Sequence, residues 1–286
     1  MLEKNTETFI SCDAEYSEAS IVLFGAPFDG TTSFRPGTRF APRAIRGDSF
    51  GIETYSPYQN RDLTQLKVFD CGDLDFPFGN TQRVLNMVEA HTGKVLTDGK
   101  LPFMLGGEHL LTLGAVKAVF KKHPDLHLIH FDAHTDLRDE YLGEELSHAS
   151  VMRRIWDFLG DGRIHQFGIR SGEKYEFEFA KRHTDFHPFN MEGLEETVQK
   201  IGTAPVYFSL DLDVLDPSCF PGTGTPEPGG ISFKELLNAV LALSTLNIVG
   251  CDINELSPPY DPSGISTAAA CKILREVLLV IGNGSL

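Results

Sequence analysis

The sequence predicts an α/β fold with three layers, in which helices cover both faces of a mainly parallel central sheet. Two observations support this prediction. Apolar runs of strand length recur along the 286 residues and are too continuous for half-exposed strands, and segments with helical periodicity separate them. No internal repeat or low-complexity linker interrupts this alternation. We therefore expect a single domain over residues 1–286.

Seven apolar runs are predicted as buried strands, and each ends near Gly, Asp or Pro. They cover residues 20–27, 67–73, 101–107, 126–134, 163–170, 205–213 and 247–255. In open parallel sheets, ligands bind beyond the carboxyl ends of the strands. We therefore expect the functional residues at these ends.

Three helices are marked by their ends. Apolar residues repeat with helical spacing between Asn80 and Gly99, and this glycine is placed to end that helix. Ser232 is followed three residues later by Glu235, the capping-box pattern that satisfies free amides at a helix start. The last helix is expected to close at Gly282.

Composition limits the partners and the compartment. A formal net charge of −15 argues against nucleic acid or an anionic membrane as a partner. It is compatible with cationic small molecules as ligands. The alternative is that the acidic surface simply keeps the protein soluble. No apolar run approaches the about 18 residues of a membrane span. Residues 1–18 lack the features of a secretory signal, so we expect a cytoplasmic protein with a loosely ordered start. Its five cysteines show no C-x-x-C spacing and are expected to be reduced.

Metal-binding side chains follow four of the predicted strands. They are His109; Asp132, His134 and Asp136; Asp211 and Asp213; and Glu255. If the chain stays extended, the alternate residues within each run point to one side. Carboxylates that converge in a low-dielectric cleft repel one another, so a multiply charged cation is the natural partner.

The number of candidate ligands fits two divalent ions that share bridging carboxylates, an arrangement that activates water and polarises a substrate. Oxygen ligands with some imidazole and no thiolate favour Mn²⁺, and Co²⁺, Fe²⁺ and Zn²⁺ remain compatible. The alternative for any single residue is a structural role. His109, for example, could merely cap the helix that follows it.

Four motifs resemble those of the ureohydrolase family of arginases and agmatinases, in the same order: "GGEH", "DAHTD", "SLDLDVLDPSCFPGTGTPEPGG" and "DINELSPPYD". The resemblance runs from about residue 25 to the final helix, and residues 33–46 are more similar to the agmatinase branch. It implies the fold shared by arginases and deacetylases, trimers or hexamers, and two Mn²⁺ per subunit. The implied ligands are His109, Asp132, Asp136 and Asp211 for one ion, and Asp132, His134, Asp211 and Asp213 for the other.

The resemblance also implies roles in catalysis. Glu255 would pair with a substrate guanidinium, Asp136 would accept a proton from the nucleophile, and His148 would relay a proton to the leaving amine. His148 is suited to this because an ordinary histidine titrates near neutral pH. Its alternative is an exposed histidine at a helix start.

The expected reaction is hydrolysis of a guanidinium group to urea and an amine, with agmatine as substrate and putrescine as the second product. The loop after "DAHTD" is acidic, and Asp139 and Glu140 are predicted to contact the cationic substrate. Arg138 could instead favour an acid such as guanidinobutyrate. Arginine and formiminoglutamate are further alternatives.

Two rival functions remain. Deacetylases with a related architecture use one zinc ion and fewer aspartates, so metal stoichiometry separates them from this prediction. A relative that binds metal without turnover is the second rival, and it is disfavoured because every expected ligand is present together with Glu255 and His148.

Overall fold

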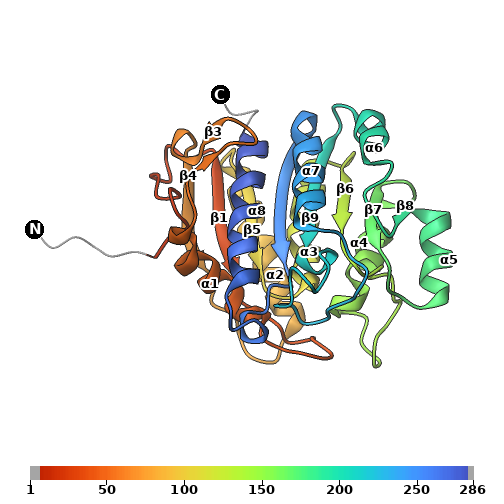
Figure 1. Ribbon diagram of the computed structural model, residues 1–286. Coiled ribbons are helices and arrows are strands. Elements are labelled where there is room, and N and C mark those ends of the chain that lie inside the picture. The colour runs from red at the N-terminus through yellow and green to blue at the C-terminus, as the bar shows by residue number, and fades with distance from the viewer. Residues whose placement is uncertain (1–6, 283–286) are drawn as a thin grey trace, which may run out of the picture.

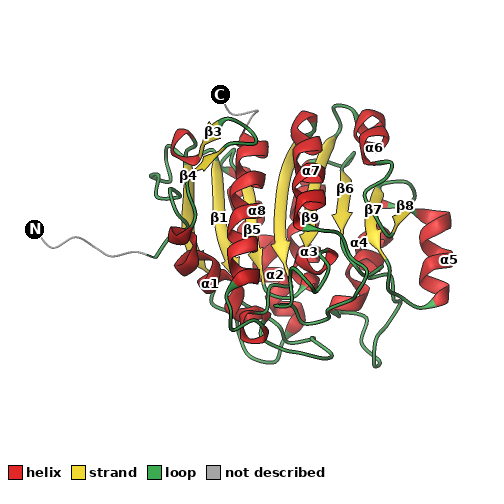
Figure 2. Ribbon diagram, viewed as in Figure 1, coloured by secondary structure: helices red, strands yellow, loops and turns green. Residues whose placement is uncertain are grey.

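The computed structural model describes residues 7–282, in which one eight-stranded sheet lies between two layers of helices (Figures 1 and 2). The strands are β1 Ile21–Ala26, β4 Val68–Asp73, β5 Leu101–Gly106, β6 His127–Phe131, β7 Ile164–Ile169, β8 Asp185–Pro188, β9 Pro205–Asp211 and β10 Asn247–Asn254. They lie in the order β4-β1-β5-β10-β9-β6-β7-β8, and every neighbouring pair is parallel. The predicted three-layer α/β/α fold is confirmed.

The seven predicted strands all form, and the sheet has one further strand, β8, at its edge. This strand reads "DFHP" and is only half-buried, so it lacks the continuous apolar run by which the others were recognised. A separate two-stranded antiparallel pair joins β2 Tyr55–Ser56 to β3 Arg61–Asp62.

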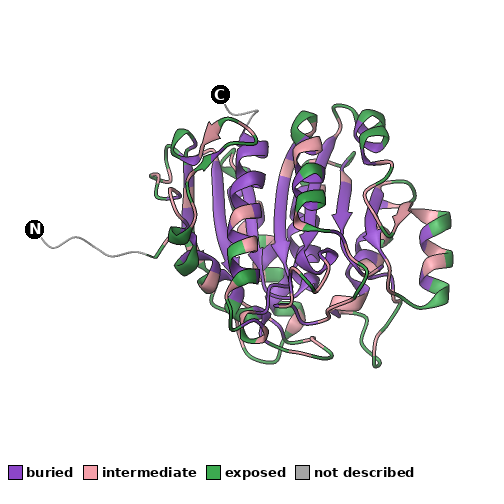
Figure 3. Cartoon of the chain, viewed as in Figure 1, coloured by how far each residue is buried: buried purple, intermediate pink, exposed green. Residues whose placement is uncertain are grey.

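The helices are α1 Ala41–Asp48, α2 Thr81–Thr97, α3 Thr112–Lys122, α4 Val151–Leu159, α5 Lys174–His183, α6 Leu194–Ile201, α7 Phe233–Ala242 and α8 Ile265–Ile281. Helices α1, α6, α7 and α8 pack on one face of the sheet, nearer the viewer in Figure 2, and α2, α3 and α4 pack on the other. Each helix layer forms a hydrophobic core with one face of the sheet, and alternate strand residues point into the two cores. Phe103 and Leu105 belong to the core with the first helix layer, and Met104 belongs to the core with the second. The sheet is accordingly buried on both faces (Figure 3).

The predicted helix ends are confirmed. The side chain of Asn80 accepts a hydrogen bond from the backbone N–H of Arg83, which caps α2. Ser232 and Glu235 form the reciprocal capping box of α7. Helix α8 ends at Ile281, directly before Gly282.

The start of the described chain is attached to the core. Phe9 and Cys12 are fully buried, and the backbone N–H of Phe9 donates to Asp70 at 2.9 Å. Two buried apolar side chains thus attach the described part of this segment, residues 7–18, to the core; residues 1–6 lie outside the described part. All five cysteines are free thiols, as predicted. Within residues 7–282, no helix is long and apolar enough to cross a membrane.

A histidine pair beside β8 makes stability depend on pH. His165 donates from Nδ1 to Asp185 at 2.8 Å, so its Nε2 accepts from Nδ1 of His127 at 3.0 Å. Burial lowers the pKa of His127 to about 4, below the value of about 6.5 in an unfolded chain. As pH falls from about 6.5 to about 4, His127 binds a proton in the unfolded chain but stays neutral in the folded chain. The free energy of unfolding therefore decreases across this pH range.

We expect the wild type to lose more unfolding free energy than His127→Gln between pH 7 and pH 4.5. The difference should be about 1 kcal/mol, because solvent screens this half-buried ring. Urea denaturation at both pH values measures it. Equal losses in the two proteins would contradict this assignment.

Candidate active site

Four neighbouring strands at the centre of the sheet, β5, β10, β9 and β6, all end at one site. His109 begins the turn after β5, Asp132 follows β6, Asp211 ends β9 and Glu255 follows β10. Because the carboxyl ends of adjacent parallel strands share one edge, residues from distant parts of the sequence meet here. The structure brings all six predicted metal ligands and Glu255 to this edge.

The first group of ligands surrounds Nδ1 of His109. This atom lies 3.0 Å from Oδ2 of Asp132, 3.2 Å from Oδ2 of Asp136 and 3.2 Å from Oδ2 of Asp211. The other ring nitrogen, Nε2, is 2.9 Å from the hydroxyl of Ser209, and that hydroxyl donates to Asp252 at 2.7 Å.

This hydrogen-bond chain fixes the form of the His109 ring. Because the Ser209 hydroxyl gives its proton to Asp252, it must accept from Nε2–H of His109. Nδ1 of the neutral ring then carries a lone pair, and this buried atom has no hydrogen-bond partner among the described residues. A lone pair that faces three carboxylate oxygens is the donor set of a cation, so the residues fit a divalent metal.

The second group lies around His134. Its Nδ1 is 3.0 Å from Oδ2 of Asp213 and 3.4 Å from Oδ1 of Asp132. Asp132 therefore offers Oδ2 to the first group and Oδ1 to the second, an arrangement that lets one carboxylate bridge two ions through both of its oxygens. Asp211 joins the first group through Oδ2, while its Oδ1 accepts the backbone N–H of Asp213 at 2.9 Å.

The two-residue spacing had suggested that extended chain brings these side chains together. The structure shows that it does not. Strand β6 ends at Phe131, and Asp136 has a left-handed backbone with φ of 52°. Asp213 lies in a 3-10 turn, Leu212–Val214, rather than in a strand. The tight turns, and not a two-residue period, bring these side chains together.

Burial sets the electrostatics of the site. It raises the pKa of Asp136 to about 7, and together with the charge of Asp213 it raises the pKa values of Asp211 and Glu255 well above their ordinary range. Burial opposes protonation of His109, yet the surrounding carboxylates hold its pKa well above the usual value. Without metal, bound protons must offset the negative charge of the clustered carboxylates. Divalent cations would offset the same charge and leave the carboxylates ionised.

Glu255 is held in an unusual backbone conformation, with φ of 66°. Its Oε1 accepts the backbone N–H of His109 at 2.7 Å, and its own N–H donates to the carbonyl of Gly107 at 3.0 Å. A Cβ atom on Gly107 would lie 1.9 Å from the carbonyl oxygen of Phe28, so only glycine fits there. The "GGEH" motif thus allows β5, β10 and the loop after β1 to approach closely around Glu255.

His148 is fixed by the loop after β1. Its Nδ1–H donates to the carbonyl of Thr31 at 3.0 Å, which leaves a lone pair on Nε2, 3.1 Å from the hydroxyl of Ser33. Thr31 is anchored in turn, because its hydroxyl donates to the buried Glu108 at 2.6 Å. Burial lowers the pKa of His148 to about 4 and keeps the ring neutral.

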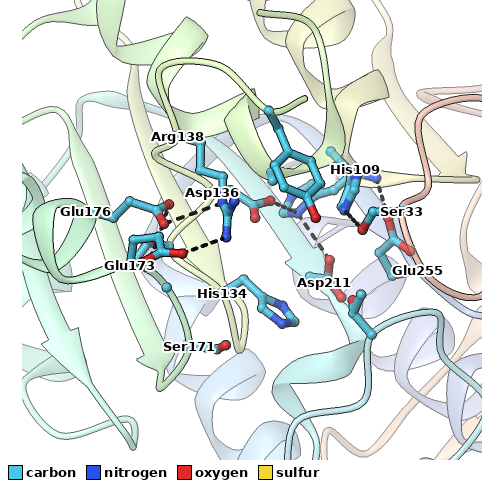
Figure 4. Close-up of a pocket in the computed structure, with 16 residues that line it drawn as sticks. Ser33, His109, His134, Asp136, Arg138, Ser171, Glu173, Glu176, Asp211 and Glu255 are labelled. Atoms are coloured by element: carbon cyan, nitrogen blue, oxygen red, sulfur yellow. Dashed lines mark hydrogen bonds and ion pairs between the residues drawn. The ribbon is translucent and has the colours of Figure 1, made fainter. Parts of the chain in front are cut away.

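A cavity of about 340 Å³ connects these residues to solvent (Figure 4). Beyond the ligands, its wall contains Arg138, Tyr141, Glu173 and Glu176. Arg138 lies 3.6 Å from each glutamate, and its guanidinium stacks 4.4 Å from the centre of the Tyr141 ring.

Asp139 and Glu140, which the sequence predicted as substrate contacts, do not line this cavity. The Asp139 side chain is 69% exposed and pairs with Arg154 at 3.0 Å, and Glu140 is exposed. The acidic side chains of the wall come instead from the start of α5 and the turn before it. Sequence reasoning missed Glu173 and Glu176, because no motif marks them and only the fold places them opposite Arg138.

Comparison with known proteins agrees with this geometry. The model of the arginase family matches residues 19–280. The chain belongs to the arginase family. An agmatinase of Bacillus anthracis is 48% identical over 277 residues, which cover 96% of each chain, and a guanidinobutyrase of Pseudomonas aeruginosa is 34% identical, with 95% of this chain and 89% of that protein covered.

A solved family structure shows the same fold. The agmatine ureohydrolase of Thermoplasma volcanium superimposes with a TM-score of 0.89 at 36% identity, over 97% of this chain and 95% of that one. Family membership and the two buried ligand groups that share Asp132 together indicate a binuclear metal site.

Proposed function

We propose that the protein hydrolyses agmatine to putrescine and urea. The relatives named agmatinase and agmatine ureohydrolase support the reaction. The observation that favours agmatine over other guanidines is the charge of the cavity wall, where two glutamates face a single arginine.

The metal centre is proposed to hold two Mn²⁺ ions. His109, Asp132, Asp136 and Asp211 would hold one, and Asp132, His134, Asp211 and Asp213 the other. When bound, two divalent cations supply activated water at neutral pH. The count also separates this function from a deacetylase, since metal analysis should find two ions per active chain rather than one zinc.

The remaining steps belong to the protein side chains. The Glu255 carboxylate accepts hydrogen bonds from the planar guanidinium and holds its carbon toward the nucleophile. Asp136 accepts the proton that the nucleophile releases. The lone pair on Nε2 of His148, beside the Ser33 hydroxyl, first takes up a proton from water in the cavity, and Nε2 then passes that proton to the amine that leaves.

The cavity wall explains the preference for a cationic tail. Arg138 would attract a carboxylate if its charge were free, but Glu173 and Glu176 both lie 3.6 Å from it. The three groups together carry one net negative charge. An ammonium group, such as that of agmatine, is therefore attracted to this wall, whereas the carboxylate of arginine, guanidinobutyrate or formiminoglutamate is repelled.

A substrate panel tests this specificity. Protein loaded with Mn²⁺ is offered agmatine, arginine, guanidinobutyrate and formiminoglutamate separately; urea is measured for the first three and formamide for the last. We expect the highest kcat/KM with agmatine. A higher value with guanidinobutyrate, the substrate named for the Pseudomonas aeruginosa relative, would overturn the interpretation of Arg138 and leave the reaction class intact.

His148→Ala should retain both metal ions and lower kcat by about 10²- to 10⁴-fold, the range for loss of a general acid or base. The ring lies outside both ligand groups, so its loss affects proton transfer rather than metal binding. Steady-state kinetics and metal analysis of the same sample measure the two effects. His123→Ala, on a histidine remote from the cavity, is the control, and a His148→Ala variant with unchanged kcat would exclude the proposed role.

We also propose that the chain forms one domain, assembles into trimers or hexamers and works in the cytoplasm. These proposals are supported by family membership and by the sequence features described above.

A further inference from the structure

His130 is a fully buried histidine in β6 that the proposed mechanism does not use. Its Nε2 lies 2.7 Å from Oδ2 of Asp132, the same oxygen that lies 3.0 Å from Nδ1 of His109. By distance alone, His130 therefore qualifies as a ligand of the first metal. Its hydrogen-bond partners, however, indicate that it is not a ligand.

Gln166 in β7 determines which nitrogen of His130 carries the proton. The terminal nitrogen of this amide lies 2.9 Å from the backbone carbonyl of Thr135 and 3.1 Å from Nδ1 of His130. A carbonyl can only accept, so the NH₂ end of Gln166 must point this way, and its second N–H donates to His130. Nδ1 of His130 is then the acceptor and Nε2 carries the proton. A protonated Nε2 donates a hydrogen bond and cannot bind a metal.

The proton on His130 holds one end of the Asp132 carboxylate. Nε2–H donates to Oδ2, and the backbone N–H of His134 donates to Oδ1 at 2.6 Å. Each oxygen thus has one protein donor and faces one ligand group. Two donors at opposite ends fix the plane of the carboxylate, which determines whether a single side chain can reach two ions.

We propose that His130 is a positioning residue that orients Asp132 as the bridge between the two metals, and that Gln166 holds His130 in the tautomer this requires. The inference rests on the binuclear centre of the proposed function. It does not depend on agmatine being the substrate.

Metal binding without substrate provides the test. Mn²⁺ bound per chain is measured against free Mn²⁺ by equilibrium dialysis for the wild type, His130→Phe and Gln166→Met. The first variant keeps a ring and removes the donor, whereas the second keeps a side chain of similar size and removes the amide. We expect both variants to retain two sites with affinity lowered by about 10- to 100-fold, the range for partners of metal ligands.

Two results would overturn the proposal. If His130→Phe lost one ion completely while Gln166→Met bound normally, His130 would be a ligand. If both variants bound as the wild type does, His130 would serve packing alone.

Nitrogen-15 NMR of the imidazole rings gives a readout that does not require the phenylalanine variant to fold. In wild-type protein, with or without diamagnetic Zn²⁺, His130 should show a proton on Nε2 and none on Nδ1, and Gln166→Met should weaken this preference. A proton on Nδ1 in the wild type would contradict the inference. Failure of agmatine hydrolysis would not alter any of these results.

Discussion

Asp132→Asn should bind neither metal ion firmly and should lose urea release almost completely. Asp132 presents one oxygen to each ligand group, at 3.0 Å from His109 and 3.4 Å from His134, so one substitution affects both sites. An amide keeps one oxygen but places an NH₂ where the other group needs a ligand. The loss should exceed the about 100-fold that marks the upper range for a residue that only supports a ligand.

Metal analysis of desalted protein and a urea assay on the same preparation measure both effects. Asp125→Asn is the matched control, because this exposed aspartate lies just before the same strand and outside the ligand groups. Two tightly bound ions in Asp132→Asn would refute the bridging role.

Glu255→Gln should retain both metals and lower kcat/KM for agmatine by about 30-fold to several thousand-fold, which corresponds to the 2–5 kcal/mol cost of breaking a buried charge pair. The amide oxygen of glutamine can still accept the backbone N–H of His109, as Oε1 of Glu255 does at 2.7 Å. Its NH₂ group would then face the N–H groups of the guanidinium, so donor meets donor and the charge attraction is lost.

Steady-state kinetics with agmatine and metal analysis separate binding of the guanidinium from assembly of the metal centre. Glu192→Gln, at an exposed glutamate outside the cavity, provides the control. A Glu255→Gln variant with kcat/KM within a few-fold of the wild type would show that the guanidinium binds elsewhere.

The fold was predictable where burial leaves a strong pattern. Strands such as β9 and β10 are covered by helices on both faces, so they read as continuous apolar runs. The edge strand β8 has no such cover, and its sequence carries no pattern that separates it from a loop. In the N-terminal segment, Phe9 and Cys12 are buried within a mostly polar stretch, so no apolar run in the sequence marks their contact with the core.

The convergence of the candidate metal ligands was predictable for a related reason. They directly follow apolar strands, and the parallel order of those strands brings them to one edge. Residues that act through a neighbour leave no such mark: His130 reads as part of an apolar run, and Thr31 lies in a loop. Their roles depend on which hydrogen-bond donor faces which acceptor in the folded chain.

The cavity wall shows the same limit for substrate choice. The sequence presented Asp139, Glu140 and Arg138 as one charged loop with opposing implications. In the structure, Asp139 faces an arginine of α4, whereas Arg138 is paired with two glutamates near α5. The net charge that the cavity wall presents to the substrate therefore depends on which side chains form ion pairs in the folded chain. The local sequence of the loop does not determine these pairs.

In the proposed reaction, water attacks the guanidinium carbon, and the bond from this carbon to the tail nitrogen breaks. Mass spectrometry of the products formed from agmatine in ¹⁸O-labelled water, by protein loaded with two Mn²⁺, tests it most directly. We expect unlabelled putrescine and urea with one ¹⁸O atom, in equal amounts. Ammonia together with a labelled carbamoyl derivative of putrescine would contradict it, because a different carbon–nitrogen bond would have been broken.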